Sequence, residues 1–410
     1  MLKKIKAKLL VTVFGGAGTP VLSASAGAAT ETAQRLGCRI YGAWHGLQGI
    51  LNEDFGDLTA LDPSILEKLM RTTYAALGTA RDKPTDEDGV KIARVLQAHG
   101  ADGLIYFGGN DTAEKINIIS KAAASIGSSM SMIHGIKTVD WDVPENIFTP
   151  GSLSAVRYIA KEVRWNSGDN WSMQGVLIIV VMGRNAGWLA GSAARARRRP
   201  DQGPHLIYCP EVDFYESRFL SDVKAMYERY GHCLVVVSEG IHDKDGTLIA
   251  EKDAAALARD AHNNAVLSGS GLDQRLCSLV QSGLGIKRVR ALTLGAGTRS
   301  HDDVAPIDLA AARGVGQKAV EYALAGRTGS VVVKDFHSNP SGGFRLEYDL
   351  VPLELVADKT KVMPRRYINE AGNHVTDAYL EFLRPLVGLE LPEDFQLRDH
   401  VKPVRKLLTQ

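Results

Sequence analysis

The sequence predicts an α/β protein built from two doubly wound units. Short apolar runs alternate with helix-length amphipathic stretches along most of the chain, and this rhythm is typical of parallel sheets joined by crossover helices. At 410 residues the chain exceeds the length that one hydrophobic core usually supports. Polar and glycine-rich segments follow several apolar runs. Because ligands of such sheets bind beyond the carboxyl ends of the strands, we expect the functional site there.

The expected elements follow from the apolar runs in chain order. The run Leu9–Phe14 is short and ends at two glycines, so we interpret the N-terminus as a first strand, not as a targeting segment. The expected strands are Leu9–Phe14, Arg39–Ala43, Gly103–Phe107, Ser131–Gly135, Val176–Met182, His205–Cys209, Cys233–Ser238, Val289–Thr293 and Ser330–Lys334. Expected helices between several of them include Glu87–His99, Asp111–Ile126 and Asp308–Ala325.

The composition is that of a folded enzyme without a general polyanion or membrane surface. Apolar residues make up 45% of the chain, charged residues 23%, and the formal net charge is +1. Nucleic-acid and membrane partners are therefore not expected, and any anion site must be local. The four cysteines lie far apart without CxxC spacing. This pattern indicates reduced thiols and a cytoplasmic location, and neither a disulfide framework nor a zinc site.

The segment from Gly108 to Thr112 is the most informative motif. It follows the apolar run 104–107 and precedes an expected helix, so its backbone amides are suited to a phosphate group. Asp111, however, puts a carboxylate into this anion site. A carboxylate repels phosphate unless a metal ion or a lysine lies between them. Lys137, close to Asp140 and Asp142 in the chain, is such a lysine.

Taken singly, the remaining motifs are weak, but their joint order resembles the phosphofructokinase family across nearly the whole chain. The glycine-rich segment 15–18, for example, misses the GxGxxG spacing of dinucleotide sites. The matching segments are Gly15 to Pro20, Gly78 to Arg81, Gly108 to Thr112, Thr138 with Asp140 and Asp142, Met182-Gly183-Arg184 with Ala186-Gly187-Trp188, Pro210-Glu211, and Ser238-Glu239-Gly240. The stretch from Tyr367 to Asn373 also resembles the pyrophosphate-using branch of the family.

The resemblance implies phosphoryl transfer to a sugar hydroxyl with Mg²⁺. Such a transfer needs a base for the hydroxyl proton and cations for the phosphate charge. By resemblance Asp140 is the base, and Asp142, expected to point the same way in an extended segment, holds the metal directly or through water. Asn110 takes the place of a metal-linked aspartate found in many relatives. A neutral amide should bind the ion more weakly.

Two positions favour pyrophosphate as the phosphoryl donor. By resemblance, ATP-using relatives have glycine at the position of Asp111, whereas pyrophosphate users have aspartate there and lysine at the position of Lys137. The Asp111 carboxylate would occupy the space that a nucleotide needs, and Lys137 would supply a cation to pyrophosphate. Both are therefore expected to act in catalysis. The residues implied to bind the donor phosphates are Gly16, Arg81, Gly108, Gly109 and Thr112.

The acceptor site departs from the family pattern. The residues implied to bind the acceptor are Thr138, Asp142, Met182, Gly183, Arg184, Glu239, Arg290 and Arg299. Relatives that use fructose 6-phosphate place an arginine where this chain has Gly175, and a ring-bearing residue where it has Ala296. Losing one of the charged side chains that bind the acceptor's phosphate as a clamp should weaken the binding of that acceptor, since charged hydrogen bonds are worth ~1.5–3 kcal/mol. Either the acceptor is another sugar phosphate or a polyol, or His301, Arg365 or Arg366 restores the clamp.

Three functions are compatible with these residues. The leading one is a pyrophosphate-dependent, nearly reversible kinase that makes fructose 1,6-bisphosphate from fructose 6-phosphate. An ATP-dependent kinase on the same fold would need Asp111 turned away from the nucleotide. A ligand sensor that has lost chemistry would bind without turnover, but it has no need to retain Lys137, Asp140, Asp142 and Arg184 together.

The resemblance also implies two Rossmann-like domains with the active site in the cleft between them. Residues 1–150 plus about 297–350 would form the phosphoryl-donor domain, and about 151–296 plus 351–410 the acceptor-sugar domain. Family members complete the acceptor site with residues of a neighbouring subunit. The resemblance therefore implies a homodimer or homotetramer, with Arg290 and Arg299 as candidates for this contribution.

Overall fold

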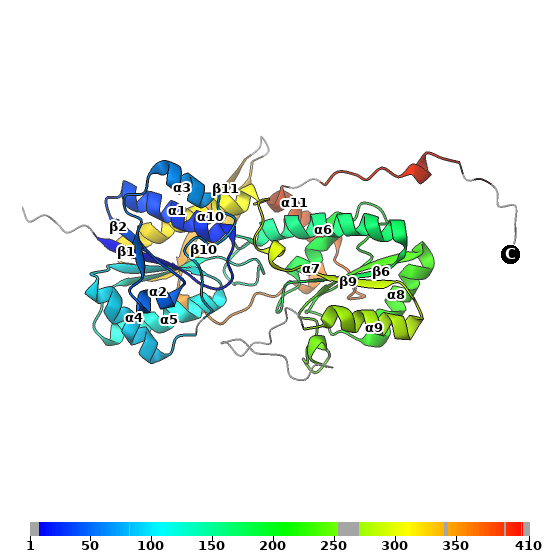
Figure 1. The fold of residues 1–410 in the computed structure, drawn as a ribbon, viewed down its shortest axis with the longest axis horizontal. Coiled ribbons are helices and arrows are strands. Elements are labelled where there is room, and N and C mark those ends of the chain that lie inside the picture. Colours follow the sequence, from blue (N-terminus) through cyan, green and yellow to red (C-terminus); the bar gives the residue numbers. More distant parts are fainter. Residues whose placement is uncertain are drawn as a thin grey trace, which may run out of the picture.

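The computed structural model describes residues 8–81, 83–252, 270–339, 343–388, 391–402 and 404. Two sheets, each covered by helices on both faces, lie side by side along the longest axis (Figure 1). Among the residues described, no helix combines the length and apolar character needed to cross a membrane.

The first sheet has seven strands in the order β11-β10-β5-β4-β1-β2-β3. Its strands are β1 (Leu9–Phe14), β2 (Arg39–Ala43), β3 (Phe55–Asp57), β4 (Gly103–Gly108), β5 (Ser131–Ile136), β10 (Gly329–Ser338) and β11 (Phe344–Val351). Its helices are α1 (Pro20–Arg35), α2 (Leu47–Leu51), α3 (Pro63–Met70), α4 (Asp86–Ala98), α5 (Asn110–Ser125) and α10 (Pro306–Leu324). Apolar side chains of α1 and α10 pack on one face, and those of α2, α4 and α5 on the other.

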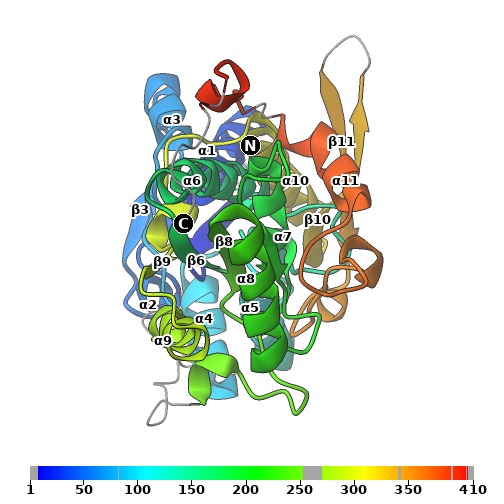
Figure 2. The ribbon, with the colours of Figure 1, turned by 90° about the vertical axis from the view of Figure 1, so that its right-hand side faces the viewer.

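The second sheet has four parallel strands in the order β7-β8-β6-β9. Its strands are β6 (Gly175–Val181), β7 (Leu206–Tyr208), β8 (His232–Ser238) and β9 (Val289–Thr293). Its helices are α6 (Ser152–Met173), α7 (Trp188–Ser192), α8 (Glu216–Tyr230), α9 (Leu272–Leu284) and α11 (Asp377–Val387). Alternate strand residues pack against α8 and α9 on one face and against α6, α7 and α11 on the other. Figure 2 views the molecule from the side of this sheet.

The expected strands are all present, with boundaries that differ by at most a few residues, and so are the three expected helices. The expected parallel pairing holds except at the two edges of the first sheet, where β3 and β11 pair antiparallel with β2 and β10. Neither strand was expected. β3 has only three residues, and most side chains of β11 are partly or fully exposed, so neither forms an apolar run.

The chain enters the first sheet twice. Strands within residues 9–136 and 329–351 belong to the first sheet, and those within residues 175–293 belong to the second. One buried apolar cluster runs from the α1 and α10 side of the first sheet to the α6 and α11 side of the second. The sheets therefore share a core, which fixes the strand ends of one against those of the other. The assignment of donor and acceptor phosphates to separate domains stays a prediction.

Candidate active site

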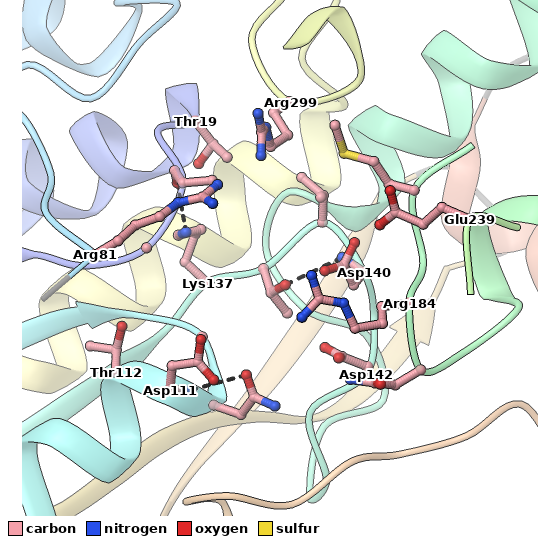
Figure 3. A pocket seen from close by; sticks show the side chains of 18 of the residues that line it. Thr19, Arg81, Asp111, Thr112, Lys137, Asp140, Asp142, Arg184, Glu239 and Arg299 are labelled. Carbon is pink, nitrogen blue, oxygen red and sulfur yellow. Dashed lines mark hydrogen bonds between the residues drawn. The ribbon is translucent and has the colours of Figure 1, made fainter. Parts of the chain in front are cut away.

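Loops after strands of both sheets line one cavity of about 270 Å³ (Figure 3). Strands β1, β4 and β5 of the first sheet lead into loops that line it, and β6 and β8 of the second sheet lead into the loops that begin at Met182 and Glu239. The lining residues are Gly16, Ala17, Thr19, Arg81, Gly109, Asn110, Asp111, Thr112, Lys115, Lys137, Thr138, Val139, Asp140, Asp142, Met182, Arg184, Asn185, Glu239 and Arg299. The strand ends thus bring together segments more than a hundred residues apart in the chain.

The glycine-containing loop at Gly108, between β4 and α5, packs tightly around Thr112. A Cβ at Gly108 would lie 2.0 Å from Thr112 Oγ1, so only glycine allows the loop to approach this side chain. Within the described chain, the buried hydroxyls of Thr19 and Thr112 have no hydrogen-bond partner. Buried polar groups are usually satisfied. These two hydroxyls are therefore available to an anion in the cavity.

Helix α5 points its N-terminus at the same cavity. It spans Asn110–Ser125, and its first turn carries Asp111, whose backbone N–H donates to Asn110 Oδ1 at 3.0 Å. The N-terminal amides of a helix of this length favour an anion. The Asp111 side chain, however, places a negative charge beside them (Figure 3). The site is therefore selective about which polyanion it accepts.

Lys137 is a buried cation in the cavity lining, just after β5. Its Nζ donates to the carbonyl of Ala17 at 2.8 Å, which ties the end of β5 to the first glycine-rich loop. Burial lowers the pKa of Lys137 to about 8, against the opposing effect of the nearby Asp140 carboxylate. Arg81 and Arg299 lower it further by like-charge repulsion. Three cations thus face the same cavity, as a bound polyphosphate requires.

Asp140 and Asp142 both line the cavity, but the segment between them is not extended as expected. Trp141 has a positive φ of 61°, so the backbone turns between the two carboxylates. Burial raises the pKa of Asp140, and Arg299 and Lys137 oppose this rise. Burial, together with the charge of Asp140, raises the pKa of Asp142 to about 7. Both carboxyl groups nevertheless reach the cavity (Figure 3).

The loops after strands of the second sheet add Met182, Arg184 and Glu239. Figure 3 shows Arg184 extending toward Asp140 and Asp142, with Glu239 above them. Burial raises the pKa of Glu239 to about 7, and Asp140 raises it while Arg184 lowers it. Arg299 closes the cavity from the loop after β9, and the neighbouring Ser300 Oγ donates to the carbonyl of Gly18 at 3.3 Å. That hydrogen bond joins the loops of the two sheets.

Several expected residues lie outside the lining. Gly108 and Gly183 belong to the lining loops without bordering the cavity. Arg290 Nη2 instead forms an ion pair with Asp169 at 2.7 Å. Of the candidates for a restored clamp, His301 stacks on Tyr158 at 5.3 Å, Arg365 donates to backbone carbonyls, and Arg366 lies over Tyr367. None of the three lines the cavity.

The position of Gly175 accounts for its missing side chain. It begins β6, whereas Met182 follows the other end of this strand. A Cβ at Gly175 would lie 2.6 Å from the carbonyl oxygen of Arg288 and 3.0 Å from its Cγ. The side chain of Arg288 therefore occupies the space where a longer residue at position 175 would begin.

Thr19, Lys115 and Asn185 line the cavity but were not expected there. Lys115 lies one helical turn after Asp111 on α5 and is 1% exposed. The i, i+4 spacing from Asp111 is the sequence signal that points to Lys115. Thr19 lies within the motif from Gly15 to Pro20, of which only Gly16 was expected to bind, and Asn185 directly follows Met182-Gly183-Arg184. The motifs therefore already pointed to both positions.

The oxygen donors of the cavity fit a hard divalent cation. Asp140 and Asp142 are buried together, and the raised pKa of Asp142 reflects a carboxylate in need of a compensating charge. Asn110 adds an amide to the same cavity lining. Carboxylate and amide oxygens are the ligands that Mg²⁺ and Ca²⁺ prefer.

Comparisons with known proteins agree with this geometry. The model of the family described as phosphofructokinase matches residues 9–323. A pyrophosphate–fructose 6-phosphate 1-phosphotransferase of Rhodospirillum rubrum is 42% identical over 96% of this chain and 98% of its own. One of the same name from Halomonas elongata is 31% identical over 92% and 91%. The crystal structure of a pyrophosphate-dependent phosphofructokinase from Marinobacter aquaeolei covers 95% of this chain and 94% of its own, with a TM-score of 0.80 and 27% identity. The chain belongs to the phosphofructokinase family.

Proposed function

We propose that the protein transfers a phosphoryl group from pyrophosphate to the 1-hydroxyl of fructose 6-phosphate. The products are fructose 1,6-bisphosphate, phosphate and a proton, and the reaction is nearly reversible. One observation carries the proposal: Asp111 and Lys137, the pair expected of a pyrophosphate user, line the same cavity as Asp140. The names of the Rhodospirillum rubrum and Halomonas elongata relatives support both the donor and the acceptor.

Asp140 accepts the proton of the acceptor hydroxyl as the new O–P bond forms. It is buried among Lys137, Arg184 and Arg299, whose charges counter the rise in its pKa that burial causes. These three cations therefore favour the ionised form of the carboxylate, which is the form that acts as a base. Base catalysis of this kind commonly contributes ~10²–10⁴-fold to the rate.

Lys137 and Arg81 hold the donor, together with the free hydroxyl of Thr112 and the N-terminal amides of α5. Lys137 is held by the carbonyl of Ala17 and therefore acts without a large loss of side-chain entropy. The Asp111 carboxylate disfavours the α-phosphate and nucleoside of ATP in the same space. Gly16 and Gly109 let the backbone approach the phosphates.

Arg184, Glu239 and Arg299 face the acceptor side, with Thr138 and Met182 completing the wall. Asp142 and Asn110 would hold Mg²⁺, which neutralises pyrophosphate charge when bound. A homodimer or homotetramer remains our expectation for the assembly. Within one chain Arg290 pairs with Asp169 at the surface, where a neighbouring subunit could reach it.

A second acceptor is favoured by the departures at Gly175 and Ala296. No side chain fits at Gly175 without displacing the backbone of Arg288. Ala296 opens a short turn, and there it provides no ring to border the sugar. Neither residue lines the cavity, so this second candidate, another sugar phosphate or a polyol with the same donor chemistry, rests on the departure from the family pattern.

Initial rates of the purified protein with Mg²⁺ and fructose 6-phosphate test the donor, with pyrophosphate and ATP compared at equal concentration. We expect turnover with pyrophosphate. Asp111→Gly should lower the ratio of the rate with pyrophosphate to the rate with ATP. Turnover of the natural protein with ATP alone would overturn the donor assignment. Turnover with another sugar phosphate or a polyol but not with fructose 6-phosphate would favour the second acceptor. Binding of pyrophosphate without turnover on any acceptor would indicate a sensor.

A further inference from the structure

Trp141 has an unusual backbone conformation between the two site carboxylates. Its φ of 61° lies in the left-handed region, and its side chain is fully buried. Bulky residues rarely adopt this region, and they keep it only where the surrounding structure imposes it. An extended backbone at Trp141 would send Asp140 or Asp142 in a different direction. The left-handed turn is therefore the local feature that brings both to one cavity.

The indole ring of Trp141 is held by Trp188. Their ring centroids lie 5.3 Å apart with an interplanar angle of 18°, so the rings are stacked. Trp141 Nε1 donates to the carbonyl of Ile147 at 2.8 Å, and Phe382 of α11 contacts the ring at a centroid distance of 5.7 Å. These contacts fix the ring, and the fixed ring maintains the strained backbone.

Lys361 provides a second connection between Trp188 and the segment that carries Asp142. Its backbone N–H donates to the carbonyl of Asp142 at 2.6 Å, and its own carbonyl accepts from Trp188 Nε1 at 3.2 Å. Its Nζ donates to the carbonyl of Asn146 at 2.6 Å and lies 5.2 Å from the Trp188 ring. The segment that carries Asp142 is thus tied to Trp188 by a ring stack and by two hydrogen bonds to the backbone of Lys361, one from the backbone of that segment and one from the Trp188 indole.

Trp188 begins α7, directly after the acceptor-side loop that starts at Met182. The loop before it is fixed because Glu211 Oε1 accepts from the backbone N–H groups of Gly187 and Met363, both at 2.8 Å. Any displacement of the acceptor-side loop would therefore be transmitted to the ring of Trp141.

We propose that Trp141 is a positioning residue, whose left-handed backbone, imposed by the stack on Trp188, aims Asp140 and Asp142 at the reacting groups. This inference rests on the proposed function. The stack links the geometry of the two carboxylates to the loop that carries Arg184. Trp141 itself is not among the residues that line the cavity, so it acts through its neighbours.

The pair of variants Trp141→Asn and Trp141→Val tests the proposal. Both remove the ring and leave a similar void, but asparagine tolerates positive φ whereas valine does not. We expect kcat of Trp141→Val to fall about tenfold or more below that of Trp141→Asn, because a misplacement of about 1 Å can cost ~10²-fold. The KM values for pyrophosphate and fructose 6-phosphate should stay within about threefold of each other in the two variants. A role limited to core filling would lower both kcat values alike and would overturn the proposal.

Trp188→Leu tests the stack itself. In the natural chain it should lower kcat, and Trp188→Phe should restore most of the loss. Combined with Trp141→Asn, it should lower kcat much less, because asparagine needs no stack to hold its backbone. Equal losses in both backgrounds would contradict the coupling. These comparisons still decide the question if Trp141→Val fails to fold.

Two controls separate this proposal from the proposed function. Trp165→Leu changes an exposed tryptophan of α6, 57% exposed, and should leave kcat unchanged. Absence of pyrophosphate-dependent turnover in the natural protein would overturn the proposed function, and with it the basis of this inference. Normal turnover in the natural protein with equal kcat in the two Trp141 variants would overturn the positioning role alone.

Discussion

Asp140 is surrounded by Lys137 from the first sheet and by Arg184 and Arg299 from loops of the second. Its role as the base can be tested by removing its charge alone. Asp140→Asn keeps the shape of the side chain but cannot accept the hydroxyl proton. We expect kcat to fall by ~10²–10⁴-fold, with little change in the KM of either substrate. Steady-state rates in the forward direction measure this. Asp86→Asn, at the exposed start of α4, is the control. A loss of less than about tenfold would mean that another group takes the proton.

Lys137 should give the reaction an alkaline limit. Burial lowers its pKa to about 8, so in the free enzyme it loses its charge above that pH. Because kcat/KM reports groups of the free enzyme, kcat/KM for pyrophosphate should fall as pH rises through about 8. Lys137→Arg keeps a cation at these pH values and should remove this limb, even if the rate is lower overall. If kcat/KM for pyrophosphate still falls above the same pH in Lys137→Arg, the decrease is caused by the titration of a different group.

His134 should make the fold sensitive to acid. It is fully buried on β5, and because its ring is neutral, one nitrogen donates to the carbonyl of Gly108 at 3.0 Å and the other accepts from Ser330 Oγ at 2.7 Å. Burial lowers its pKa from 6.5 to about 4. Between these values the unfolded chain binds more protons, so stability falls as pH decreases from about 6.5 to 4, by up to about 3 kcal/mol.

Thermal unfolding midpoints at pH 7 and pH 5 measure this effect. In His134→Asn the midpoint should change less between the two pH values than in the natural protein. A residual change is expected in both, because burial also lowers the pKa of His205 to about 3. The same pH dependence with and without His134 would show that its protonation does not limit acid stability.

The residues of the site were largely predictable because they follow strands that the sequence identifies. Asp111, Lys137 and Asp140 come directly after apolar runs, and parallel strands bring such ends together. The turn at Trp141 was not predictable from a local pattern. A left-handed tryptophan is sustained by Trp188 and Phe382, which are distant in the sequence. The catalytic and binding roles of the residues that line the cavity stay predictions until they are measured.

At the scale of elements, the contact between α1 and α10 depends on a glycine. α10 crosses α1 where a Cβ at Gly316 would lie 2.1 Å from the carbonyl oxygen of Ser25. Gly316→Ala must therefore push backbone against backbone, and we expect a loss of ~1–3 kcal/mol and a lower thermal midpoint. Because this contact packs one face of the first sheet, the midpoint reports the integrity of the donor side.

Gly168→Ala is the matched control for that change. It also introduces alanine into a helix, α6, but no atom lies within 4 Å of the added Cβ. It should raise stability by about 0.4–1 kcal/mol, since alanine restricts the unfolded chain more than glycine does. Equal midpoints for the two variants would show that α1 and α10 separate at little cost.

The strands of the fold were predictable where they are buried, and were missed where they are not. β6 and β8 have continuous apolar runs because both faces of the second sheet are covered. β11 alternates exposed and partly buried side chains at a sheet edge, and β3 has only three residues. These two antiparallel edge strands therefore leave no apolar run in the sequence, and their pairing depends on tertiary contacts that a local pattern does not show.

At the scale of the whole molecule, the two sheets form a single site because one apolar cluster crosses from one to the other. Loops from both sheets line the cavity, and the hydrogen bond from Ser300 to the carbonyl of Gly18 joins them at its edge. The cleft position predicted for the site follows from this shared core.

The central claim is that pyrophosphate, and not a nucleotide, exchanges phosphoryl groups with the sugar in this cavity. The reverse reaction tests it most directly. The purified protein, with Mg²⁺, fructose 1,6-bisphosphate and inorganic phosphate but no nucleotide, can be followed by ³¹P nuclear magnetic resonance. We predict a growing pyrophosphate signal together with fructose 6-phosphate, and neither with Asp140→Asn. Release of fructose 6-phosphate only when ADP is supplied would contradict the account.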